Sequence, residues 1–135
     1  MSRGLALLLC IVGTACSASA DVDQKVTLEV RDGWIREPDS ECAGSRPFLY
    51  VHRSSPFRVE EGASGKVVAR GVLPEGKAVE AMREDLGAAR VPTFCRFRFT
   101  ISLPGPGDYR LVLDEGGPLG FSTRSESSDV KLIIP

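Results

Sequence analysis

Few residues in this 135-residue chain could carry out catalysis, and the most reactive of them lie close together. His52 is the single histidine, and Ser54 and Ser55 follow it within three positions. A serine hydrolase needs a base beside the serine, a residue that orients the base, and donors for the oxyanion. The chain has no G-x-S-x-G turn, and the carboxylates of Glu60 and Asp85 could assist only if the fold brings them near. We therefore expect no enzyme, and keep as the alternative an accessory hydrolase or inhibitor with a loop site near His52.

A metal site has equally little support. One histidine cannot supply a transition-metal site. The acidic residues Asp21, Asp23 and Asp39-Ser40-Glu41 lack the spacing of a loop that wraps calcium. We expect the chain to fold without metal or cofactor.

Three arginines, Arg96, Arg98 and Arg110, could form a basic stripe on the polar side of the predicted strands. Surface arginines are more often solvated charges paired with nearby acids, here Asp114, Glu60 or Glu61. Residues 21–135 hold 16 basic side chains, since Arg3 lies outside them, against 18 acidic ones, a net charge of −2. This balance favours neither nucleic acid nor an anionic membrane as a partner.

The first twenty residues have the composition of a secretory signal peptide. Arg3 precedes an apolar run, Leu5 to Val12, that is too short to span a bilayer, and the small residues Ala18-Ser19-Ala20 offer a cleavage site before Asp21. The alternative is a lipoprotein signal at Gly13-Thr14-Ala15-Cys16, with a lipid on Cys16, although Gly13 stands where such signals usually carry leucine. Both alternatives predict a protein that is secreted or held at the cell envelope. No later stretch is apolar enough for a membrane span.

Two of the four cysteines, Cys42 and Cys95, remain after such a signal is removed. In an oxidising compartment we expect these two to form a disulfide. The crosslink would close a loop of about fifty residues, which corresponds to roughly 4 kcal/mol in the chain-entropy estimate. No C-x-x-C motif indicates a redox or metal role.

The clearest pattern in the chain is the alternation of apolar and polar residues from Phe94 to Leu113. Cys95, Phe97, Phe99, Ile101 and Leu103 alternate with Arg96, Arg98, Thr100 and Ser102, and Tyr109, Leu111 and Leu113 continue the alternation after Pro104-Gly105-Pro106-Gly107. A period of two predicts two strands, each with one buried face. The prolines and glycines between them predict a turn.

The turn at 104–107 allows two arrangements. A hairpin would place Leu103 opposite Tyr109 and Arg98 opposite Asp114. An inter-sheet corner, closed by the tyrosine hydroxyl as in immunoglobulin-like domains, fits equally well. Either one predicts an all-β antiparallel sandwich, immunoglobulin-like or prealbumin-like, of about seven strands with one disulfide. Residues 21–135, 115 positions after 20 are subtracted from 135, suffice for one such domain.

Other strands are expected at 24–31, 48–52, 57–60, 66–73, 121–124 and 130–134. Val26, Leu28 and Val30 should point inward in the first. Gly71 suggests a bulge or a close approach of another segment. Trp34 is expected to cover the core. Residues 77–86, with Val79, Met82 and Leu86 at helical spacing before Gly87, predict one short helix or a loop.

The order of features from Cys42 onward resembles a type of small secreted domain found in actinobacteria. The pattern comprises Cys42-Ala43-Gly44, Gly65-Lys66-Val67-Val68, Gly71-Val72-Leu73-Pro74-Glu75-Gly76, the Cys-x-Phe-x-Phe run from Cys95 to Phe99, a proline-rich turn with a tyrosine, and a final apolar strand. This chain departs from it at residues 48–55 and in a longer insert near 77–92. The resemblance implies the fold and the disulfide, and no activity.

Together these observations predict a non-enzymatic extracellular or envelope binding module, with an unknown partner bound through loops or an edge strand.

Overall fold

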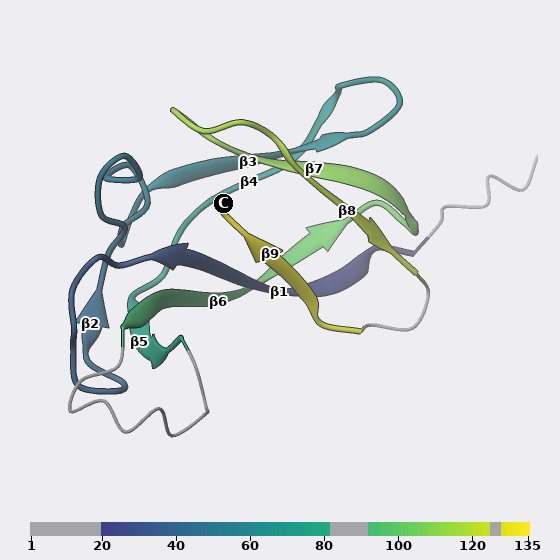
Figure 1. The fold of residues 1–135 in the computed structure, drawn as a ribbon. Helices are drawn as coiled ribbons and strands as arrows, with labels where there is room; N and C mark the ends of the chain where they lie inside the picture. Colours follow the sequence, from purple (N-terminus) through teal and green to yellow (C-terminus); the bar gives the residue numbers. More distant parts are fainter. Residues whose placement is uncertain (1–19, 82–91, 125–127) are drawn as a thin grey trace, which may run out of the picture.

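The computed structural model describes residues 20–81, 92–124 and 128–135, which form two β-sheets packed face to face, seen as an upper and a lower layer in Figure 1. The described residues contain nine strands and no helix. The five-stranded sheet has the order β2 (Glu41–Cys42), β5 (Gly76–Glu80), β6 (Thr93–Leu103), β1 (Val22–Arg31), β9 (Val130–Ile133). The four-stranded sheet has the order β4 (Val67–Val72), β3 (Pro56–Glu61), β7 (Gly107–Leu113), β8 (Leu119–Thr123). The predicted all-β sandwich is confirmed. No helix in the described part of the chain is long and apolar enough to cross a membrane.

The centre of the five-stranded sheet is the long antiparallel pair of β1 and β6. Leu28 lies opposite Phe97 and Val30 opposite Cys95, so the inward residues of both strands share one face. Val26, Leu28 and Val30 are buried, as their alternation predicted. Phe97, Ile101, Leu111 and Leu113 belong to the same core, and Phe99 is half-buried with its ring centre 5.0 Å from that of Phe57. β9 pairs with β1 in parallel, so the sandwich is mostly, and not wholly, antiparallel.

The proline-rich turn at 104–106 is an inter-sheet corner. β6 pairs with β1 and β5 in one sheet, whereas β7 pairs with β3 and β8 in the other, so the hairpin alternative was wrong. The buried Tyr109 hydroxyl donates a hydrogen bond to the Gly105 carbonyl oxygen at 2.6 Å. Arg98 lies opposite Thr27 and not opposite Asp114.

The short helix or loop predicted over 77–86 is wrong where the chain is described. Residues 76–80 form β5, whose Ala78 lies opposite Cys95 and is buried. Pairing with the open edge of β6 satisfies the backbone of these residues, and this outweighs the helical spacing of the side chains. Residues 82–86 lie outside the described part. β5 and the two-residue β2 raise the strand number from about seven to nine.

The strand predicted at 48–52 is a series of turns. The Val51 amide donates to the Phe48 carbonyl oxygen at 3.0 Å, and the Gly44 amide donates to the Val51 carbonyl oxygen at 2.7 Å. These local bonds replace a strand ladder. Val51 is buried, and Phe48 and Tyr50 pack against the core. Apolar residues occur on both sides of this segment because it is a coil that covers one end of the sandwich.

Gly71 marks the close approach that its position in β4 suggested. It lies opposite Phe57, and a Cβ atom at Gly71 would lie 2.6 Å from the Phe57 ring. The Phe57 side chain therefore fills the space that any other residue at position 71 would need. The bulge in this strand pair lies instead at Val59/Glu60.

Candidate functional site

One end of the sandwich carries most of the long connections. Antiparallel pairing places the ends of β1, β4 and β7 beside the starts of β3, β6 and β8. This end therefore holds the segments 32–55, 73–75 and 114–118, together with the last residues, 134–135. We call it the loop end; the connection between β1 and β3 lies on the left of Figure 1. In sandwiches, binding residues usually occur on loops such as these.

Trp34 and Ile35 project from the loop end into solvent. Trp34 is 68% exposed and Ile35 55% exposed, so the prediction that Trp34 covers the core was wrong. Leu49, in the neighbouring coil, is exposed as well. The sequence signal for this feature was the Asp32-Gly33 pair, which turns the chain away from the sheet directly before Trp34.

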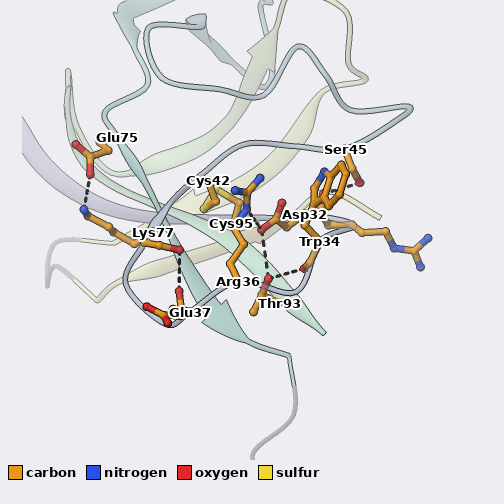
Figure 2. Close-up of a disulfide and its surroundings, with 12 residues drawn as sticks. Asp32, Trp34, Arg36, Glu37, Cys42, Ser45, Glu75, Lys77, Thr93 and Cys95 are labelled. Carbon is orange, nitrogen blue, oxygen red and sulfur yellow. Dashed lines mark hydrogen bonds and ion pairs between the residues drawn. A yellow bond between two sulfur atoms is a disulfide. The ribbon is translucent and has the colours of Figure 1, made fainter. Parts of the chain in front are cut away.

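A buried aspartate holds the base of the Trp34 loop, as Figure 2 shows. Asp32 is 0% exposed, and its Oδ2 accepts a hydrogen bond from Arg36 Nε at 2.7 Å. The Thr93 hydroxyl, on β6, donates to the Trp34 carbonyl oxygen at 2.8 Å and lies 3.2 Å from Asp32 Oδ2. These contacts fix the backbone of residue 34 to the five-stranded sheet.

The same loop is held on its other side by Ser45. The Ser45 amide donates to the Arg31 carbonyl oxygen at 3.0 Å. Gly33 has a φ of 71°, and a Cβ there would lie 2.6 Å from Ser45 Oγ. Glycine is therefore required at this turn both for its conformation and for the space beside Ser45.

The predicted disulfide is confirmed and lies beside this loop. The sulfur atoms of Cys42 and Cys95 are 2.10 Å apart, and Figure 2 shows the bond next to Arg36 and Asp32. Cys42 is in β2, and the crosslink ties the segment after the Trp34 loop to β6. The Asp39 amide, which donates to the Ala78 carbonyl oxygen at 2.9 Å, provides a further tie to β5. The proposed lipidation residue, Cys16, lies outside the described residues.

Asp32 Oδ1 is buried and has no hydrogen-bond partner among the described residues. A buried carboxylate oxygen without a partner is costly, and most native structures contain few such atoms. The ion pair with Arg36 is what offsets this cost. The loop base is thus a contact between a buried carboxylate and a partly exposed guanidinium.

A second feature of the loop end is a small apolar hollow of about 230 Å³. It is lined by Phe48, Tyr50, Leu113, Gly116, Gly117, Pro118, Leu119, Ile134 and Pro135. Phe48 and Tyr50 pack edge to face with ring centres 6.5 Å apart. Pockets for small molecules usually exceed about 300 Å³, so this hollow would fit one apolar side chain of a partner.

The side chains of His52 and Ser55 contact backbone groups of their own segment. The exposed His52 ring has Nδ1 2.7 Å from the Arg53 carbonyl oxygen. The buried Ser55 hydroxyl donates to the Tyr50 carbonyl oxygen at 2.7 Å and accepts from the His52 amide at 3.0 Å. Within the described ranges no carboxylate contacts the His52 ring. Glu60 pairs with Arg58 and Arg110, and Asp85 lies outside these ranges. The described residues also contain no group of three or more His, Cys, Asp or Glu side chains that could hold a metal ion.

The three arginines that the sequence suggested as a basic stripe do not lie on one sheet. Arg96 and Arg98 are on β6, and Arg110 is on β7 in the other sheet, where its Nη2 lies 3.5 Å from Glu60 Oε2. The pairing of Arg110 with Glu60 agrees with its interpretation as an ordinary surface charge. Arg96 pairs with Glu29 of β1. Arg98 has no ion-pair partner among the described residues.

Comparison with protein-family models, curated proteins and solved structures finds no match to this chain. A functional interpretation therefore depends on the geometry of the molecule itself.

Proposed function

We propose that this protein is an exported, non-enzymatic binding module that recognises an extracellular or envelope partner through the loop 33–36, with Trp34 as the central contact. The observation that carries this proposal is the 68% exposure of Trp34 on a loop whose base is held by Asp32, Arg36 and Thr93. The disulfide supports export, because disulfides persist mainly in oxidising compartments.

Single exposed apolar residues are common on soluble proteins and need no special explanation. The Trp34 loop differs because two large apolar side chains are adjacent, and because the Trp34 carbonyl is bonded to Thr93 and Arg36 to Asp32. Tryptophan is among the residues most enriched at binding hot spots. A loop already ordered before binding loses less conformational entropy when a partner docks.

The test is capture of a partner from culture supernatant and envelope extract on the immobilised protein, followed by measurement of affinity for the captured molecule. Trp34→Ala should weaken binding about 30-fold or more, as expected for a hot-spot residue. Val72→Ala is the matched control, because Val72 is 60% exposed and lies on β4, in the four-stranded sheet. Equal affinity of the wild type and Trp34→Ala would contradict the proposal.

An accessory hydrolase or inhibitor at His52 has less support, because the Ser55 hydroxyl is bonded to backbone groups and does not contact the imidazole. A screen with ester, peptide and glycosidic substrates tests this alternative. Turnover by the wild type that is lost in His52→Ala would favour the hydrolase. We expect no turnover by either protein.

A further inference from the structure

The outer face of the five-stranded sheet is rich in cations, although residues 21–135 carry a net negative charge. Outward positions alternate with the buried ones and are aligned by the strand register. Among the described residues of β1, β5, β6 and β9, these positions hold the basic side chains Lys25, Arg31, Lys77, Arg96, Arg98 and Lys131, and the acidic side chains Asp23 and Glu29. Glu41, on β2 opposite Lys77, adds one acid at the edge.

Three of these cations surround Thr27 near the middle of the face. Thr27 lies opposite Arg98 on one side and opposite Lys131 on the other. Arg98 and Lys131 are therefore two strands apart, about 10 Å at the usual strand spacing. Lys25 lies two residues from Thr27 on the same strand, about 7 Å away along it. The cations thus form a spaced array and do not converge on one point.

Glu29, the one carboxylate that the described residues place in the middle of this face, is already neutralised. Arg96 Nη2 lies 2.5 Å from Glu29 Oε1, and Lys131 Nζ lies 3.0 Å from Glu29 Oε2. Arg98 and Lys25 have no ion-pair partner among the described residues, and both are exposed. Their charges are therefore available to a ligand.

Two shallow hollows flank Arg98. One, of about 180 Å³, is lined by Arg96, Arg98 and Lys77 together with Asp39, Glu75 and Val79. The Glu75 carboxylate is paired with Lys77. The other hollow, of about 190 Å³, is lined by Lys25 and Arg98 with Thr27, Thr100, Val26, Phe99 and Asp129. Both hollows hold more cations than carboxylates, and Arg98 lines both.

We propose that this face binds an anionic glycopolymer, an extended polysaccharide-type chain whose phosphate, sulfate or carboxylate groups repeat along its length, with Arg98 at the centre of the contact. Arginine binds these oxyanions through two parallel hydrogen bonds. A single exposed ion pair contributes little in water, so an array of spaced cations favours a polymer over a free anion. Nucleic acid fits less well, because base stacking needs exposed aromatic rings and the aromatic residue on this face, Phe94, is half-buried.

The test uses the protein obtained from the full-length chain, applied to immobilised dextran sulfate and to uncharged dextran. We expect retention on dextran sulfate at about 20 mM salt, no retention on dextran, and loss of affinity as salt rises and the Debye length shortens. Arg98→Gln and Lys25→Gln should each weaken binding at least about 3-fold, and the double variant about 10-fold, because each removes one contact of a multivalent array.

The matched control is Arg70→Gln. Arg70 is also exposed and has no ion-pair partner among the described residues, but it lies on β4 in the other sheet. A variant at either arginine changes the net charge by the same amount, so a general charge effect would weaken both equally. Thermal unfolding checks that all variants fold, as expected for exposed positions.

Three results would overturn the proposal: no retention on dextran sulfate at low salt, equal weakening by Arg70→Gln and Arg98→Gln, or tighter Arg98-dependent binding to duplex DNA than to dextran sulfate. Retention that depends on Arg98 and Lys25 and is unaffected by Trp34→Ala would support it independently of the loop-end function.

Discussion

Glu29 occupies an outward position of β1 and is nevertheless only 6% exposed, because Arg96 and Lys131 cover it. Burial alone would raise the pKa of Glu29, but the hydrogen bonds and charges of Arg96 and Lys131 outweigh burial and lower the pKa below its usual 4.5. A carboxylate with a lowered pKa in the folded state stabilises the fold above its unfolded pKa. This contribution is lost as pH falls below about 4.5 through the folded pKa.

We therefore predict that Glu29→Gln lowers the free energy of unfolding by about 1.5 to 3 kcal/mol at neutral pH, the range for a hydrogen bond to a charged group. The difference from the wild type should shrink as pH falls below about 4.5. Urea unfolding at a series of pH values measures this. The exposed Glu37→Gln is the control and should change little; a pH-independent effect of Glu29→Gln would contradict the assignment.

Trp34 is the single tryptophan, so all tryptophan fluorescence of the protein comes from this loop. The emission wavelength reports the exposure of Trp34, and the anisotropy reports the mobility of the loop. The wild type should show emission close to that of the unfolded chain, since Trp34 is 68% exposed. Asp32→Ala removes the acceptor for Arg36, leaves that guanidinium without its partner and should destabilise the protein by about 1 to 3 kcal/mol.

Fluorescence anisotropy of Asp32→Ala should also fall below that of the wild type, because the loop loses one of its ties. Ser40→Ala is a suitable control, since the Ser40 hydroxyl donates within its own turn, to the Glu37 carbonyl oxygen at 2.7 Å. Blue-shifted emission from the folded wild type would show that Trp34 is buried and would remove the basis of the loop-end proposal.

At the scale of elements, the corner between β6 and β7 is closed by Tyr109. The pKa of Tyr109 is raised by burial and by the charge of Glu61. A raised pKa means that the neutral phenol is favoured in the folded state. Its contribution to stability is complete below the unfolded pKa, about 10, and is lost as pH rises through the folded pKa.

We predict that Tyr109→Phe destabilises the protein by about 1 kcal/mol at neutral pH, through loss of the bond to the Gly105 carbonyl oxygen. Above pH 10 the wild type should lose stability more steeply than this variant. Chemical unfolding between pH 8 and pH 11 measures both effects, with Tyr50→Phe as the control for the other tyrosine. Parallel stability curves for the wild type and Tyr109→Phe would contradict the role of the phenol.

At the scale of the whole molecule, the disulfide joins residues 53 positions apart and encloses β3, β4 and β5. Replacing both cysteines with serine should lower the free energy of unfolding by about 4 kcal/mol, mainly because the unfolded chain gains freedom. Guanidinium unfolding measures this, and Phe97→Ala, expected to cost about 3 to 5 kcal/mol, provides a comparison from the core. Two free thiols in a titration under denaturing, non-reducing conditions would contradict the bond.

The sequence by itself determined the inward faces of the three most regular strands and which cysteines pair. Alternation with a period of two depends only on neighbouring residues, so the inward faces of β1, β6 and β7 could be predicted without knowing their partners. The disulfide followed because residues 21–135 contain two cysteines. The outward direction of Arg110 and Glu60 followed for the same local reason, but their pairing depended on β3 and β7 being neighbours.

The tertiary structure alone decided which strands are neighbours, and with it every feature of the candidate sites. A period of two is the same in a hairpin and in a corner, so only the pairing of β7 with β3 settled the turn at 104–106. Residues 76–80 became a strand because β6 offered an open edge, which no local spacing reveals. Trp34 is exposed because Asp32 is buried against Thr93, 61 positions away. The cations around Thr27 come together because strands distant in the sequence pair side by side, and long-range pairing leaves no periodic signal in the chain.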